Sequence, residues 1–171
     1  MIAFLKTRRS IRKFTDEPVS REDLDKLLKA ALLAPSGMGK KAFECIVVQD
    51  KDTIARLKTY KKHGTVPLQT APLVLVMIGD KEKTDTWVEE AAIATMLVQL
   101  EAVALGLGST WIQLRLREGD GGSSEEAFRK ELGIPERFGV LNAIAIGHKA
   151  EEKPAYTDAD LDFSRIHFGR F

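Results

Sequence analysis

The stretch from Ala91 to Gly108 is small or apolar at nearly every position. Its length approaches that of a membrane span, but Thr95, Gln99 and Glu101 interrupt it, and a carboxylate in the middle of a bilayer is costly. We therefore predict a buried helix over 86–105. A helix that is apolar on every side is buried on every side. A chain of 171 residues has little room to cover one completely, which indicates a dimer whose interface contains this helix.

Composition narrows the class of protein. The length predicts one domain. The 26 basic and 25 acidic side chains give a net charge of +1, which excludes a strongly basic nucleic-acid binder. Cys45 is the only cysteine, so an intramolecular disulfide and a zinc site of several thiolates are excluded, and a reducing cytoplasm is expected. The N-terminus lacks the apolar core of a signal peptide. The three histidines are far apart in the chain, so we expect no metal site.

Hydrophobic periodicity and turn residues predict the other elements. Short helices are expected over 4–8, 21–33, 52–62 and 124–132, and strands over 43–49, 71–78, 109–115 and 140–146. The strand at 71–78 is apolar without alternation, which is typical of a strand covered on both faces. This order predicts an α/β or α+β layered domain over 1–150. Residues 151–171 are too polar to form a core, and we expect them to wrap the domain or a partner chain.

Basic side chains cluster near the N-terminus. Residues 1–62 carry 15 basic and 8 acidic side chains, whereas residues 63–171 carry 11 and 17. The segment Arg8–Phe14, RRSIRKF, is the densest cluster, and a four-residue spacing would place Arg8 and Arg12 on one helical face. Guanidinium and hydroxyl donors at fixed positions suit a phosphate group. The alternative is an ordinary solvated basic surface that pairs in part with the acidic remainder of the chain.

Several common sites are excluded by their motifs. The segment Ala34–Lys41, APSGMGKK, differs from the phosphate-binding Walker pattern at its first and last positions, and no strand precedes it. No G-x-G-x-x-G follows a strand, which argues against a Rossmann nicotinamide domain. No nucleophile elbow is present, so hydrolase chemistry has no support. Cys45 lies within a predicted strand and is interpreted as core filler rather than a nucleophile.

Taken together, the segments resemble the FMN-dependent nitroreductase family over nearly the whole chain. The resemblance is carried, in order, by RRSIRKF at 8–14, ALLAPSG at 31–37, FECIVV at 43–48, APLV at 71–74, LGLGSTW at 105–111 and AIGHK at 145–149. Many members of the family carry Asn, Gln, Pro and Trp where this chain has Gly39, Lys41, Ala42 and Phe43. That difference concerns the role of one loop and the substrate more than FMN binding.

The resemblance implies an α+β fold with a mostly antiparallel central sheet flanked by helices. It implies a homodimer with FMN in two clefts at the subunit interface and a C-terminal extension exchanged with the partner subunit. The implied cofactor-binding residues are Arg8, Arg9 and Ser10 at the phosphate and ribityl chain, Arg12 at the N1/O2 edge, Pro35, Ser36, Gly37, Gly39 and Lys41 from the other subunit, Trp111, the backbone of Gln113 and Leu114 near N5 and O4, and Lys149 as a second phosphate cation.

The implied function is an FMN-dependent oxidoreductase. NADH or NADPH would reduce the flavin at N5 and be replaced by a nitroaromatic, quinone or other conjugated acceptor, in a ping-pong exchange through one pocket. The flavin performs the chemistry, so no catalytic protein acid or nucleophile is expected. The alternative is an FMN-binding sensor or storage module without significant turnover. A third possibility is a flavin enzyme of different outcome, such as reductive dehalogenation or flavin-destroying oxidation.

Overall fold

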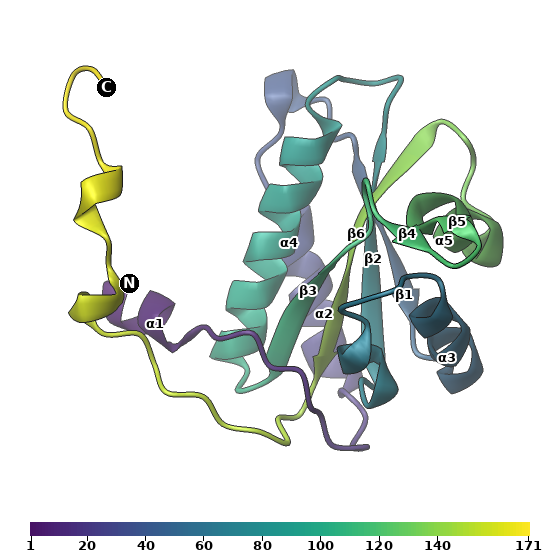
Figure 1. Ribbon diagram of the computed structural model, residues 1–171, viewed down its shortest axis with the longest axis horizontal. Coiled ribbons are helices and arrows are strands. Elements are labelled where there is room, and N and C mark those ends of the chain that lie inside the picture. The colour runs from purple at the N-terminus through teal and green to yellow at the C-terminus, as the bar shows by residue number, and fades with distance from the viewer.

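The computed structural model describes residues 1–171 and has one four-stranded antiparallel sheet with helices on both faces (Figure 1). The strand order is β1 (Phe43–Val48), β2 (Leu73–Asp80), β6 (Phe138–Gly147) and β3 (Gly108–Gln113). The helices are α1 (Ile2–Thr7), α2 (Arg21–Leu32), α3 (Lys51–Thr59), α4 (Trp87–Ala104) and α5 (Ser124–Leu132). The expectation of an α+β fold with a mostly antiparallel sheet is confirmed.

The two central strands are buried over their whole length. Every residue of β2 and of β6 is buried. Along β2, Leu73, Leu75 and Met77 belong to the core beneath α2 and α4, whereas Val74, Val76 and Ile78 belong to the core beneath α3 and α5. Successive side chains of a strand point to opposite faces, so an unbroken apolar run supplies both cores. The predicted strand covered on both faces is confirmed.

Two glycines let Trp87, the first residue of α4, pack directly against the sheet. Gly79 of β2 and Gly139 of β6 are paired across the two strands. A Cβ atom added at Gly79 would lie 2.6 Å from the Trp87 ring, and one added at Gly139 would lie 2.4 Å from it. Only residues without a side chain let an indole approach the backbone this closely. The glycine pair therefore positions the N-terminal end of α4.

Helix α4 is covered on one side only. Ala91, Ala94, Val98 and Ala102 pack into the core between α4 and the sheet. The opposite side is apolar and open: Ile93 is 40% exposed and Met96 is 38% exposed. The α4 outer face, defined by Ile93, Met96, Leu97, Leu100, Val103 and Ala104, is exposed or half-buried throughout. The helix predicted over 86–105 is confirmed, and a single chain leaves this apolar face uncovered. No helix combines the length and apolarity needed to cross a membrane.

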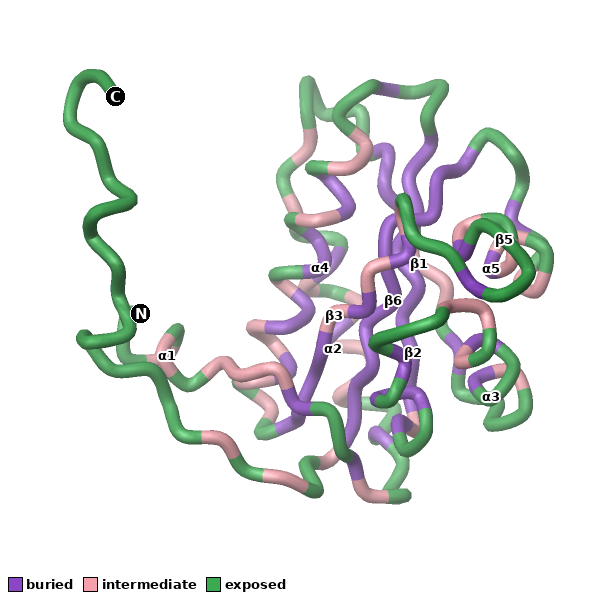
Figure 2. The backbone as a smooth tube through the Cα atoms, in the orientation of Figure 1, coloured by how far each residue is buried: buried purple, intermediate pink, exposed green.

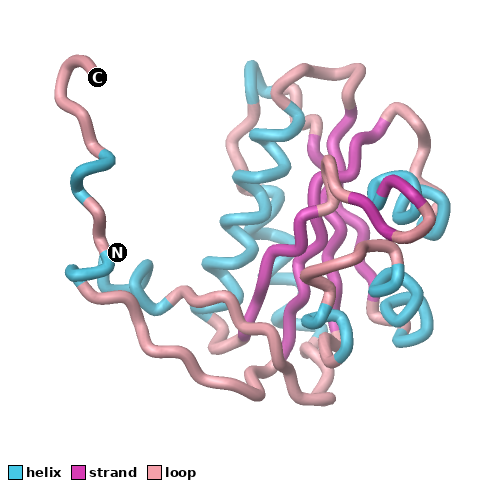
Figure 3. Tube along the Cα trace, viewed as in Figure 1, coloured by secondary structure: helices cyan, strands magenta, loops and turns pink.

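The two ends of the chain form an arm that extends away from the sheet (Figures 1 and 2). Tyr156 N donates to Lys6 O at 2.9 Å, and Lys6 Nζ pairs with Asp158 at 2.7 Å. Residues 151–171 are mostly loop with two short helical turns (Figure 3). Their apolar side chains are exposed: Leu161, Phe163, Ile166, Phe168 and Phe171. The start of the tail, through Asp158, bonds to the segment 6–12, and packing of the remainder on a partner chain stays a prediction.

The basic segment near the N-terminus is extended, which contradicts the predicted helical face. Helix α1 ends at Thr7, Ile11 N donates to Ser109 O at 3.0 Å, and Phe14 forms a bridge with Lys149. Backbone hydrogen bonds to chain segments distant in sequence satisfy the N–H and C=O groups of this segment, so it is extended rather than helical. The glycine-rich segment 119–122 lies in a short hairpin formed by β4 (Glu118–Gly119) and β5 (Gly122–Ser123).

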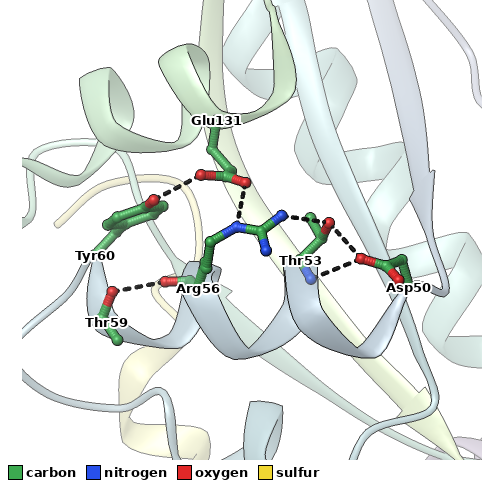
Figure 4. A network of polar contacts seen from close by, with 6 residues as sticks. All are labelled: Asp50, Thr53, Arg56, Thr59, Tyr60 and Glu131. Carbon is green, nitrogen blue, oxygen red and sulfur yellow. Dashed lines mark hydrogen bonds and ion pairs between the residues drawn. The ribbon is translucent and has the colours of Figure 1, made fainter.

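A polar network fastens α3 to α5 (Figure 4). Glu131 of α5 accepts from Tyr60 Oη at 2.6 Å and from Arg56 Nε at 2.7 Å. Arg56 also donates to Thr53 Oγ1, and Asp50 caps the start of α3 by accepting from Thr53 N at 2.8 Å. The Tyr60 hydrogen bond, followed by the Arg56 contacts, lowers the pKa of the Glu131 carboxyl below its ordinary value.

This network predicts a pH-dependent part of the stability. A carboxyl whose pKa is lowered by folding stabilises the protein above its unfolded pKa, about 4.3 for Glu, and loses that contribution as pH falls through the folded value. We expect Glu131→Gln to lower the melting temperature at neutral pH, with the difference from wild type shrinking as the pH is lowered through the acid range. Thermal unfolding between about pH 7 and about pH 3 measures it.

The matched control is Glu136→Gln, because Glu136 is exposed and makes no ion pair. Its melting temperature should follow the wild type at every pH. A constant difference between Glu131→Gln and wild type over the whole range would contradict the prediction.

Candidate functional site

The predicted cationic residues come together where β3 begins. Ser10 forms a parallel bridge with Ser109, the second residue of β3, and Phe14 forms an antiparallel bridge with Lys149. These two pairings place the segment 8–14 alongside both β3 and the chain that leaves β6. Arg8, Arg9, Ser10, Arg12 and Lys149 therefore share one region, although they are far apart in sequence.

A cavity of about 230 Å³ lies in this region, next to the C-terminal end of α4. Its charged lining comprises the cations Arg9, Lys149 and Lys153 and one acid, Glu152. Thr7, Ile11, Val103 and Leu107 complete the wall. Three cations against one carboxylate suit an anion, and the apolar wall suits the organic part of a ligand. Lys153 was missed in the sequence, where a lysine within a polar tail has no distinguishing pattern.

Residues at the start of the C-terminal tail contact this cluster of cations. The Arg9 guanidinium donates to Pro154 O and lies over the Tyr156 ring, 4.4 Å from its centroid. Lys153 Nζ donates to Ser10 O at 2.6 Å. The start of the tail thus lines the cavity through Glu152 and Lys153, and the division of the chain at residue 150 stays a prediction.

One carboxylate already occupies a donor of the cluster. Glu151 Oε1 accepts from Arg12 N at 2.5 Å and lies 3.6 Å from Lys153 Nζ. The Arg12 backbone hydrogen bond and the neighbouring Lys153 hold the pKa of Glu151 below its usual range. The Arg12 guanidinium itself is exposed and makes only a long contact, 3.4 Å, to Ser10 O. Its charge is therefore available to a ligand.

The predicted loop Pro35–Lys41 lies at the other end of α4. Gly37 N donates to Glu90, in the first turn of that helix, at 2.9 Å. The loop is largely exposed, and Met38 and Lys41 both have positive φ angles, 49° and 48°. Left-handed backbone at residues other than glycine is uncommon and clusters at ligand clamps and switch regions.

One chain does not bring the two groups of predicted residues together. The loop is tied to Glu90, and the cationic cavity includes Val103, 13 residues further along α4. At about 1.5 Å per residue these points are about 20 Å apart along the helix. The homodimer expected from the sequence would supply the missing group from a second chain, and it stays a prediction.

Trp111, Gln113 and Leu114 mark the end of β3. Trp111 Nε1 donates to Gln113 Oε1 at 2.9 Å, and Gln113 Nε2 donates to Arg115 O at 3.0 Å. Leu114 is buried, its N–H donates to Leu141 O, and its carbonyl accepts from Arg117 N. The side chains of Trp111 and Gln113 are half-buried. The predicted backbone contact of Leu114 with a ligand would have to share a donor that is already used.

Two further features lie outside this site. Burial raises the pKa of the Cys45 thiol to about 12, which agrees with its interpretation as an unreactive strand residue. A second cavity, of about 430 Å³, lies between α3 and the Phe14 segment. It contains none of the predicted cofactor-binding residues.

Comparisons with known proteins give one family. The model described as "Nitroreductase family" matches residues 5–65 and 59–148. A solved FMN-dependent nitroreductase from Clostridium difficile is 50% identical, with a TM-score of 0.97 and complete coverage of both chains. A protein of Archaeoglobus fulgidus, provisionally named an NADH dehydrogenase/NAD(P)H nitroreductase, is 36% identical over 94% of this chain and 92% of its own. A structure from Desulfovibrio desulfuricans in complex with FMN is 26% identical, with a TM-score of 0.75 and coverage of 97% and 96%.

Proposed function

The chain belongs to the nitroreductase family, and we propose that it is an FMN-dependent oxidoreductase that takes electrons from NADH or NADPH. The names of two relatives support the cofactor and the donor, since one is provisionally named an NADH dehydrogenase/NAD(P)H nitroreductase and the other was solved with FMN. The proposed acceptors are nitroaromatics, quinones and other conjugated compounds. The observation that carries the proposal is the cation-lined cavity beside the segment 8–12.

The donor set of this cavity fits a phosphate ester. Arg9, Lys149 and Lys153 line it, and Arg8 and Ser10 lie on the same extended segment. We assign these side chains to the FMN phosphate and ribityl chain. The apolar wall formed by Ile11, Val103 and Leu107 suits the uncharged carbon atoms of the ligand. Bound FMN would supply the redox chemistry, accepting a hydride at N5 from the nicotinamide and passing electrons to the acceptor.

The chain's own residues would hold and tune the ring. The exposed guanidinium of Arg12 supplies a fixed positive charge for the N1/O2 edge, where negative charge develops on reduction. Trp111 and Gln113 brace each other through their hydrogen bond at the end of β3. No protein acid or nucleophile is assigned, because the proposed reaction moves a hydride between two bound organic molecules.

A dimer would complete the site. A two-fold axis perpendicular to α4 makes the two copies of the helix antiparallel, so the start of one helix lies beside the end of the other. The loop Pro35–Lys41 of one chain would then approach the cationic cavity of its partner. The uncovered α4 outer face supports this arrangement, as does the arm with its exposed aromatic side chains. We propose that the arm is exchanged with the partner and that Pro35, Ser36, Gly37, Gly39 and Lys41 line the flavin from there.

The phosphate assignment predicts loss of flavin. We expect Arg8→Ala/Ser10→Ala to raise the Kd for FMN on the order of 100-fold, because a hydrogen bond to a charged group contributes about 1.5–3 kcal/mol. Fluorescence titration of the flavin-free protein measures the change, and circular dichroism checks the fold. Arg21→Ala removes a positive charge on α2 and should bind FMN as the wild type does. Full FMN occupancy in the double variant would overturn the assignment.

The composite site predicts that flavin binding requires the dimer. Met96→Glu places a carboxylate in the middle of the α4 outer face, where burial without a partner is costly. We expect this variant to sediment as a monomer and to lose FMN. Val66→Glu places the same charge on an exposed apolar position away from α4. This variant should stay dimeric and keep its bound FMN. A monomeric Met96→Glu that retains FMN would show that one chain suffices.

Turnover separates an enzyme from a flavin-binding sensor or storage module. Mixed anaerobically with NADH or NADPH, the FMN-loaded protein should lose its yellow absorbance within seconds and regain it when an acceptor is added. A flavin that stays oxidised would favour the module. A screen with nitroaromatic, quinone and halogenated acceptors then assigns the acceptor class and tests reductive dehalogenation.

A further inference from the structure

Glu90 is a buried acid that the proposed chemistry does not use. It is 2% exposed and lies in the first turn of α4. Its two oxygens face the loop between α2 and β1: Oε1 accepts from Gly37 N at 2.9 Å, and Oε2 accepts from Ala42 N at 2.8 Å. No cation pairs with it. Burial of an acid without a cationic partner is costly unless its hydrogen bonds compensate, which makes these two contacts informative.

The two hydrogen bonds bracket the strained part of the loop. Between Gly37 and Ala42 the chain has positive φ angles at Met38, Gly39 and Lys41. Two of these residues are not glycine, and each such conformation persists only where the surroundings enforce it. The other backbone hydrogen bonds of the loop are local turns. Gly39 N donates to Ser36 O at 3.3 Å, and Lys40 N donates to Gly37 O at 3.0 Å.

Packing at Gly37 shows how closely the loop is held. A Cβ atom added there would lie 3.1 Å from Thr86 Oγ1 and 3.5 Å from Glu90 Oε1. A side chain at position 37 would push the loop away from the carboxylate. At the other end of the loop, Asp80 N of β2 donates to Ala42 O at 2.9 Å, which ties this end to the sheet. The exposed segment 38–41 is thus anchored at both ends.

We infer that Glu90 is a positioning residue that holds segment 37–42 in the shape that lines the partner's flavin. This inference rests on the proposed function, because it was the composite site that gave the loop its role. Glu90 acts through backbone N–H groups and does not touch the cofactor. The buried Glu90 carboxylate holds the backbone of a loop whose residues 38–41 are exposed.

The test compares Glu90→Gln with Thr95→Val. An amide places an NH2 group where one loop N–H now finds an acceptor, so that N–H loses its partner. Thr95 is also buried in α4 and bonds to Ala91 O and Asn142, but it does not contact the loop. Both variants should lower the melting temperature. Only Glu90→Gln should accelerate amide hydrogen exchange at residues 37–42, by about tenfold or more.

The flavin readouts follow from a loosened loop. In the FMN-loaded protein we expect Glu90→Gln to release FMN about tenfold faster than wild type. It should also change the flavin absorbance spectrum, whereas Thr95→Val leaves both unchanged. Gly37→Ala weakens the same contact from the side of the loop and should reproduce the exchange and release effects with Glu90 intact.

The outcomes separate the two proposals. Wild-type exchange at 37–42 and wild-type FMN release in Glu90→Gln would overturn the positioning role. Equal effects in Glu90→Gln and Thr95→Val would overturn it too, because they would show general destabilisation. A wild-type protein that binds no FMN would overturn the proposed function, and exchange in the flavin-free chain would still decide whether Glu90 holds the loop.

Discussion

The rigid length of α4 sets the distance on which the whole site depends. A helix rises about 1.5 Å per residue, so Glu90 near its start and Val103 near its end cannot approach one another. The loop Pro35–Lys41 is attached at one end and the cationic cavity lies at the other. The same helix presents an apolar stripe away from the sheet. Distance and uncovered surface thus both support the proposed antiparallel pair of α4 helices from two chains.

Periodicity in the sequence was sufficient for the frame of the fold. The unbroken apolar run of β2 predicts a strand with two covered faces because both side-chain rows are apolar. Ser20 and Ser123 begin α2 and α5, as their side chains accept from backbone N–H groups three residues on. Such signals are local and can be recognised in a short window. They predict which elements form, and the family resemblance predicts how they are arranged.

The site was less predictable because its contacts are long-range. A four-residue spacing of arginines indicates a helical face, yet the segment is extended because its pairing partners, Ser109 and Lys149, lie about a hundred residues or more away in sequence. Lys153 and Glu90 share this difficulty. One is a lysine in a polar tail and the other is an acid in an apolar helix, and neither has a local pattern that announces its contact. The excess of positive charge over 1–62 was informative, since part of it is paired with Glu131 and Asp158 from the acidic remainder.

The position of Trp87 over the glycine pair has a spectroscopic consequence. The chain has two tryptophans, and both Trp87 and Trp111 pack on the side of the sheet covered by α2 and α4. The side covered by α3 and α5 contains Tyr60 but no indole. Tryptophan emission therefore reports on one half of the interior alone. Loosening of the other half would be silent in that signal and would have to be followed through tyrosine.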